Sequence, residues 1–216
     1  MTNSDRFELP MFPIGSTVFP NQVVPLHVFE ERYRQLLRDL LGTGPDAASS
    51  GATFGIVLIE RGHEVGGDDD RVSVATRVEI LQAEELDDGR WAVVTVGMER
   101  MNVHEWLEDD PYPRAIVSRR AVSDTGGSSL TDLEALLMET LELAASQAGM
   151  QMPQDFGLSN NPQQRLDQFA ALAPLNEFDR QRVLEAETTS HQITLLTEAL
   201  EGKRLLLRGV QGEHGA

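Results

Sequence analysis

Cysteine is absent from the 216 residues of this sequence. Disulfide bridges, zinc sites with thiolate ligands and cysteine nucleophiles are therefore excluded. The five histidines provide no pair at the i,i+4 spacing of a helical zinc site. We therefore expect neither a bound metal nor a cofactor, and the redox compartment stays open because a chain without thiols tolerates any.

Lysine is almost absent as well, since Lys203 is the only one. A phosphate-binding loop needs Gly-Lys followed by serine or threonine, whereas Gly202-Lys203 is followed by Arg204 in a leucine-rich segment. A serine–lysine peptidase needs a desolvated lysine amine, and Lys203 lies among charged neighbours where a solvated side chain is expected. The sequence predicts no ATPase, no peptidase and, more generally, no enzyme.

Long apolar runs are missing too. No run approaches the roughly 18 residues of a membrane span, and the N-terminus lacks the cationic start and apolar block of a signal peptide. The 18 basic and 35 acidic residues give a formal charge of −17, which disfavours phosphate backbones and anionic lipids. We expect a cytoplasmic protein that binds neither nucleic acid nor membranes.

Proline, by contrast, is concentrated near the N-terminus. Short apolar runs between residues 8 and 41 are separated by proline, which cannot donate a hydrogen bond to a strand ladder. This segment therefore predicts short edge strands and corners, followed by one amphipathic helix over Glu31–Leu41. The prolines are Pro10, Pro13, Pro20 and Pro25.

Residue patterns in the first half otherwise predict strands. The run from Phe54 to Ile59 is apolar on both faces, which is typical of a central strand. Apolar residues alternate from Val72 to Ile80, which predicts one buried face. A hairpin turn is expected at Asp87-Asp88-Gly89, because glycine supplies the positive φ of such turns. Return strands are expected at 91–98 and 114–122.

The second half has a helical period. A flexible join is expected over 123–129, with a capping box at Thr131 and Glu134 opening the first helix. Asn161-Pro162 predicts the start of a second helix, which Pro174 ends. Two further helices are expected at 177–187 and 189–208, and two mobile loops at 42–51 and 62–70.

Strands in one block and helices in the next predict an α+β fold, namely a mostly antiparallel β-barrel subdomain followed by an α-helical bundle. The expected boundaries are 1–122 for the barrel with its helix, 123–129 for the linker and 130–216 for the bundle. A cleft between two such subdomains is a common place for a ligand.

The opening pattern Leu-Pro-x-Phe-Pro, then Phe-Pro, then Pro-Leu-x-Val-Phe-Glu-x-Arg-Tyr closely resembles the N-terminal, substrate-binding domain of Lon proteases. The similarity continues through Val96–Val103, with its Gly-x-x-Arg motif, and extends to about Arg208. It implies a barrel of the pseudouridine-synthase-associated (PUA) type. It also implies a stand-alone bacterial member that engages exposed apolar segments of client proteins.

Seven residues are candidates for peptide contact. The aromatic ones either pack the barrel and its helix or line a groove for an extended peptide, since proline-interrupted edge strands leave backbone groups unpaired. An arginine could catch a peptide carboxylate, and a methionine could supply adaptable apolar contact. The candidates are Phe12, Phe19, His27, Phe29, Tyr33, Met98 and Arg100.

The leading hypothesis is a non-catalytic recognition module for apolar or unfolded protein segments, acting as an adaptor or chaperone-like protein, with a separate protease or chaperone as a further partner. The alternative is a small-molecule sensor that uses the barrel mouth or the cleft between the subdomains. RNA binding is a third reading, and the acidic charge argues against it.

Overall fold

The computed structural model describes residues 5–42, 51–61, 70–123, 129–153 and 156–213. The chain divides into two compact units, Met1–Ala121 and Val122–Ala216. The fold is α+β: among the described residues, all strands lie in the first unit and four of the five helices in the second. Two loops, 42–51 and 62–70, and the join at 123–129 were expected to be mobile. Most of each segment lies outside the described residues.

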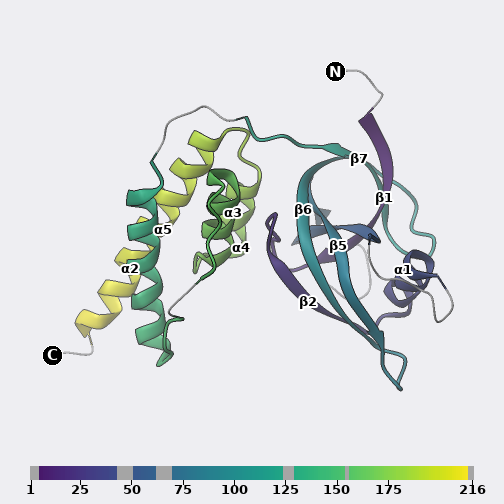
Figure 1. Ribbon diagram of the computed structural model, residues 1–216, viewed down its shortest axis with the longest axis horizontal. Helices are drawn as coiled ribbons and strands as arrows, with labels where there is room; N and C mark the ends of the chain where they lie inside the picture. The colour runs from purple at the N-terminus through teal and green to yellow at the C-terminus, as the bar shows by residue number, and fades with distance from the viewer. Residues whose placement is uncertain (1–4, 43–50, 62–69, 124–128, 154–155, 214–216) are drawn as a thin grey trace. The chain divides into compact units, whose positions relative to one another are not determined.

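The first unit is a barrel with two additional strands (Figure 1). Five strands are hydrogen-bonded in the order β1-β7-β6-β5-β3, and a parallel β1–β3 pairing returns the sheet to its start. The other pairings are antiparallel, with β2 added to β6 and β4 to β3. The strands are β1 (Arg6–Ile14), β2 (Val23–Val28), β3 (Thr53–Arg61), β4 (Asp70–Arg71), β5 (Val74–Glu85), β6 (Trp91–Trp106) and β7 (Arg114–Arg119).

The expectation of short edge strands is wrong for β1, which runs unbroken through Pro10 and Pro13. Its first half, up to Pro10, pairs with β7, and its second half, from Met11, pairs with β3. Each half pairs with a single neighbour, so a residue without an N–H fits where its nitrogen faces away from that neighbour. The expectation holds for β2, an edge strand that contains Pro25.

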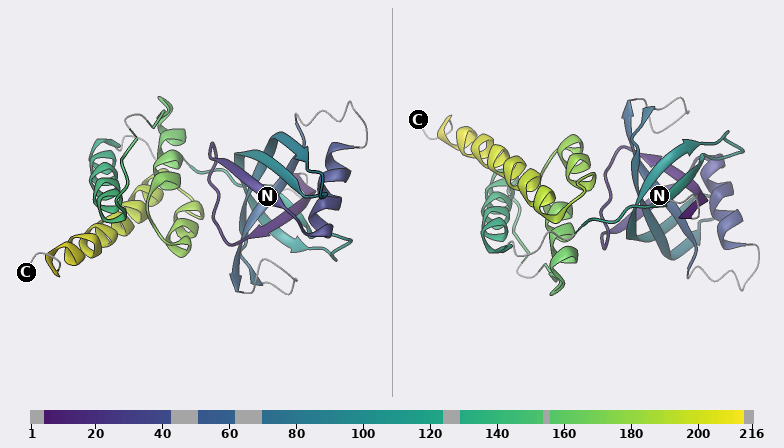
Figure 2. Two further views of the ribbon diagram at one scale, coloured as in Figure 1. Left: turned by 90° about the horizontal axis from the view of Figure 1, so that it is seen from below. Right: turned by 90° about the horizontal axis from the view of Figure 1, so that it is seen from above.

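Strand β3 is buried on both faces, as its sequence predicts. Phe54 and Ile56 belong to a cluster that includes helix α1 (Glu31–Leu41), whereas Val57 belongs to a second cluster with Met11 and Met101. The alternation follows from the two-residue period of a strand. Figure 2 shows α1 lying against the barrel, where its buried residues are Tyr33, Leu36 and Leu37.

The β5–β6 hairpin has the predicted turn, with Gly89 at φ 76°. Strand β6 continues to Trp106, well beyond the predicted end at Met98, because its second half pairs with β7. Met98 itself is an inserted residue, since Arg77 pairs with Glu99 and the next residue of β5 pairs with Gly97. Such a bulge increases the local twist and re-aims the side chain.

Gly97 is in unusually close contact with the chain between β1 and β2. Its N–H donates to the Gln22 carbonyl at 2.9 Å, and its carbonyl accepts from the Asn21 N–H at 2.8 Å. A Cβ placed on Gly97 would collide with the carbonyl oxygen of Phe19. Glycine at this position therefore allows the β1–β2 connection to dock on β6.

The described part of the second unit contains four helices: α2 (Thr131–Ala148), α3 (Pro162–Leu172), α4 (Glu177–Leu184) and α5 (Thr189–Glu213). The predicted start of α3 is confirmed, because the Asn161 side chain accepts from the Gln164 N–H at 3.1 Å. The predicted capping box is wrong: Thr131 is the first helical residue, and Glu134 instead forms an ion pair with Arg165 at 2.7 Å.

Arg180 fixes α4 to the end of α3. Its guanidinium donates to the carbonyls of Ala170 and Ala171 at 3.2 and 3.0 Å, which are among the groups a helix end leaves unsatisfied. Burial lowers the pKa of Arg180, and the carboxylate of Glu177 acts in the opposite direction. The position of α4 therefore depends on a charge held inside the unit.

We predict that Gly97→Ala destabilises the barrel by about 1–3 kcal/mol, because a backbone carbonyl must move to admit the methyl group. Both tryptophans, Trp91 and Trp106, belong to the first unit, so urea unfolding followed by tryptophan fluorescence reports on the barrel alone. The control is Gln82→Ala, which removes an exposed side chain from β5 in the same unit. An unchanged midpoint for Gly97→Ala would contradict the close-contact account.

Candidate functional site

Four of the seven candidate residues are packed into the first unit. Phe19, Tyr33 and Arg100 are only 0%, 2% and 4% exposed. Phe12 is partly buried, with its ring centroid 4.2 Å from that of Tyr33 and 6.0 Å from that of Phe54. Phe12 and Tyr33 link the barrel to α1, and all four side chains present little surface to a partner.

The other three candidates are exposed. His27 lies on β2, Phe29 follows the last residue of that strand and is 57% exposed, and Met98 lies at the β6 bulge and is 45% exposed. Two of the three therefore belong to β2 and the residue that follows it.

Strand β2 presents alternate residues to solvent. We define the β2 strip as Val23, Pro25, His27 and Phe29, which are all exposed, whereas the residues between them are half-buried or buried. Side chains of alternate residues share one face of a strand, so the strip is continuous over about 20 Å.

The backbone groups of the strip face the free edge of the sheet. Gln22 and Val24 direct their carbonyls towards β6, accepting from the Gly97 N–H at 2.9 Å and from the Thr95 hydroxyl at 3.1 Å. Because antiparallel partners alternate, the carbonyls of residues 23, 25 and 27 and the N–H groups of residues 23 and 27 point the other way. Within the described ranges β2 pairs only with β6, so this edge remains available.

Apolar surface continues from the strip onto the neighbouring strands. Val96 pairs with Val23, and Val94 pairs with Pro25, so these four side chains lie on the same face. Beside Val94, β5 contains a second irregularity at Leu81, which is 50% exposed. The site therefore combines unpaired backbone groups with adjacent aliphatic side chains.

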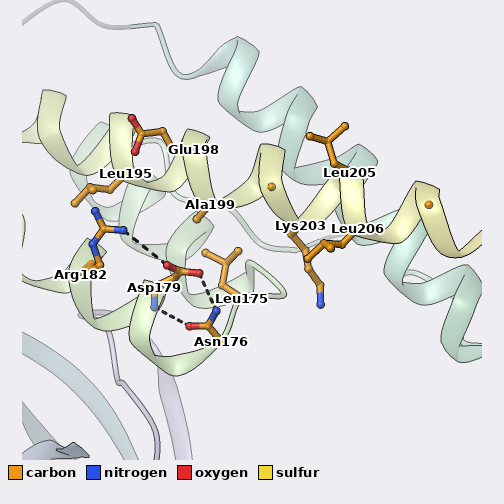
Figure 3. Close-up of a pocket in the computed structure, with 12 residues that line it drawn as sticks. Leu175, Asn176, Asp179, Arg182, Leu195, Glu198, Ala199, Lys203, Leu205 and Leu206 are labelled. Atoms are coloured by element: carbon orange, nitrogen blue, oxygen red, sulfur yellow. Dashed lines mark hydrogen bonds and ion pairs between the residues drawn. The ribbon is translucent and has the colours of Figure 1, made fainter.

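The second unit contains a groove between α4 and α5, with a volume of about 920 Å³ (Figure 3). Its apolar lining includes Leu175, Leu195, Ala199 and Leu206. This groove was not among the sites predicted from the sequence. The signal was the triplet Leu205-Leu206-Leu207, because three consecutive residues cannot all face the inside of one helix pair.

The groove contains one charged residue that has partners, Asp179, and one that has no ion pair among the described residues, Lys203. Asp179 accepts from the Asn176 side-chain amide at 2.8 Å, and Arg182 lies 3.9 Å away. Lys203 forms no ion pair with any other part of the chain that the structure describes. An unpaired ammonium beside apolar surface is available to an anionic group of a partner.

Ion pairs attach the C-terminal half of α5, called here the far half, to α2. Glu139 of α2 accepts from Arg204 at 2.9 Å and also pairs with Arg208. The hydrogen bond from Arg204 is the main reason that the pKa of Glu139 is lowered, and the charges of both arginines add to it. The Gln147 side chain also donates to the Leu207 carbonyl at 2.6 Å.

No group of three histidine, aspartate or glutamate side chains in the described ranges is arranged to hold a metal ion. No helix among these residues has the length and apolar character needed to cross a membrane.

A family model described as the ATP-dependent protease La (LON) substrate-binding domain matches residues 8–202. Among curated proteins, the Lon protease of Anaeromyxobacter dehalogenans is 25% identical over 209 residues, covering 93% of this chain and 24% of that protein. Lon protease 2 of Myxococcus xanthus is 26% identical with the same coverage. The chain thus spans about a quarter of the length of these relatives.

Two solved structures share the fold. The Lon N-terminal domain protein from Xanthomonas campestris has a TM-score of 0.62 at 24% identity, covering 88% of this chain and 98% of that one. The N-terminal domain of Mycobacterium avium complex Lon protease has a TM-score of 0.53 at 15% identity, covering 90% and 98%.

We predict that Glu139→Gln lowers the melting temperature of the helical unit at neutral pH, measured by far-ultraviolet circular dichroism. A lowered carboxyl pKa in the folded state stabilises the fold above the unfolded-state pKa, and this stabilisation is lost as the pH falls through the lowered value. The difference between variant and wild type should therefore vanish in acid.

Glu142→Gln is the matched control for this prediction, because Glu142 is an exposed carboxylate one turn further along α2. It should melt like the wild type at every pH. An equal effect of the two variants at neutral pH would show that Glu139 does not act through its arginine pairs.

Proposed function

Because the chain belongs to the family of the ATP-dependent protease La (LON) substrate-binding domain, we propose that it recognises segments of other proteins and performs no chemistry on them. The family supports recognition of a protein substrate. The finer role that we propose is that of an adaptor or chaperone-like protein, which holds apolar or unfolded segments.

The observation that carries this proposal is the β2 strip. An extended peptide gains main-chain hydrogen bonds by adding to an open sheet edge, and neighbouring side chains give it specificity. The Val23 and His27 N–H groups and the adjacent carbonyls supply the hydrogen bonds. Val23 and Phe29 supply apolar contact at the two ends of the strip, where they are 58% and 57% exposed.

Pro25 gives the edge a further property. An open strand edge can pair with another copy of itself, and proteins often prevent this with proline or charge. Pro25 removes one donor from the middle of the edge, so an incoming strand forms hydrogen bonds on either side of a gap. This arrangement favours reversible capture of a short segment over growth of a continuous sheet.

The first test is binding of a fluorescent 12-residue peptide of alternating valine and threonine. Val23→Asp and Phe29→Asp should each raise its Kd by roughly tenfold, or about 1.4 kcal/mol. Phe178→Asp is the matched control, because Phe178 is 70% exposed but lies on α4. Equal loss in all three variants would contradict a site at β2.

A second measurement separates strand addition from simple apolar contact. N-methylation of alternate peptide bonds removes the donors on one edge of the peptide while keeping its side chains. A peptide methylated at one set of alternate bonds should no longer bind, and a peptide methylated at the other set should bind unchanged. The reason is that only one edge of the peptide faces β2. Equal binding of both methylated peptides would exclude strand addition.

A further inference from the structure

The far half of α5 exposes two adjacent leucines, Leu205 and Leu206, at 66% and 70%. Figures 1 and 2 show this helix extending past the shorter helices of its own unit. The attachments to Glu139 and Gln147 hold it in place on α2. The helix therefore presents a fixed apolar surface.

The residues of α5 in the groove follow the spacing of a helix–helix seam. Successive intervals of four, three, four and three residues are those of a helix whose apolar stripe packs along a second helix. A Cβ placed on Gly202 would meet no atom within 4 Å, so the middle of this stripe is open. The seam consists of Leu195, Ala199, Gly202, Leu206 and Gly209, all of which line the groove.

Four of the five seam residues are self-complementary in the antiparallel direction. Leu195 and Leu206 are equally far from the midpoint between residues 200 and 201, and so are Ala199 and Gly202. A two-fold axis at that midpoint makes each residue contact its counterpart in a second copy. Leu206 of each copy, which is 70% exposed, then packs over the largely buried Leu195 of the other copy, and the small residues at the centre let the two helices approach closely.

Charge favours the same arrangement. Figure 3 shows Lys203 and Asp179 directed to the same side of α5, the side on which α4 lies. The two-fold axis places the second copy's Lys203 level with residue 198 on this side, where Asp179 lines the groove. Lys203, which has no ion pair among the described residues, thereby gains a carboxylate, and it does so twice in each dimer.

We propose that the α4–α5 groove binds the far half of α5 from a second copy of this chain, forming an antiparallel dimer. The surface used is separate from the β2 strip, so this inference does not rest on the proposed function. Sedimentation equilibrium should give twice the mass of 23.9 kDa at micromolar concentration, and a monomer at every concentration up to the solubility limit would overturn the proposal.

Variants locate the interface. Leu206→Glu should convert the dimer to a monomer, whereas Phe178→Glu, equally exposed but outside the groove, should not. Circular dichroism of both variants checks that they fold. A dimer that survives Leu206→Glu would exclude the seam.

The proposed ion pair between Lys203 of one copy and Asp179 of the other is tested by exchanging the two charges. Lys203→Asp and Asp179→Lys should each raise the dimer dissociation constant about tenfold, and the double variant should recover most of the loss, as expected for groups in contact. Glu201→Lys, on the same helix but outside the groove, is the charge control. Additive losses in the double variant would show that the two residues do not meet.

The absence of cysteine makes the helix direction testable. In the antiparallel dimer, Leu206→Cys protein should not cross-link to itself, because the two sulfurs lie about 16 Å apart along the axis. A mixture of the Leu195→Cys and Leu206→Cys proteins should cross-link on oxidation. Self-cross-linking of Leu206→Cys without the mixed product would overturn the antiparallel model.

Discussion

The docking of the β1–β2 connection on Gly97 is the contact on which the exposed edge of the barrel depends. A side chain at this position would push the Phe19 carbonyl away from β6. The hydrogen bonds of Gly97 with Asn21 and Gln22 set the register with which β2 begins. That register directs the odd-numbered residues of β2 outwards and their backbone groups to the free edge, so a single glycine determines what the barrel can offer to a partner.

The two units use apolar surface in different ways. In the barrel, aliphatic side chains accompany unpaired backbone groups, which suits an extended segment of almost any sequence. In the helical unit, the apolar seam has a fixed spacing and matched charges, which suits one particular partner. The proposed recognition of varied substrates and the proposed self-association are therefore compatible, because neither needs the residues that the other uses.

Features set by local interactions were predictable from the sequence. The extent of α1, the turn at Gly89 and the Asn161 cap each depend on residues close together in the chain. The continuity of β1 and the length of β6 were not predictable, since both strands change partner midway and the partners are distant in sequence.

The candidate site was predicted in part for a related reason. The proline-rich opening correctly indicated an edge strand at β2, and His27 and Phe29 lie on its exposed face. Phe12 and Tyr33 instead pack against each other in the cluster that contains Phe54, and Phe19 is fully buried. Whether an aromatic residue faces solvent depended on tertiary contacts that no local pattern records.

The most direct measurement of the central claim is amide hydrogen exchange, followed by NMR, in the presence of a permanently unfolded, reduced and alkylated protein. Strand addition should protect the Val23 and His27 amides, whose hydrogens face the open edge, while the already bonded amides of β2 change little. Binding that leaves both amides unprotected, or that protects only α4 and α5, would contradict recognition at the β2 edge.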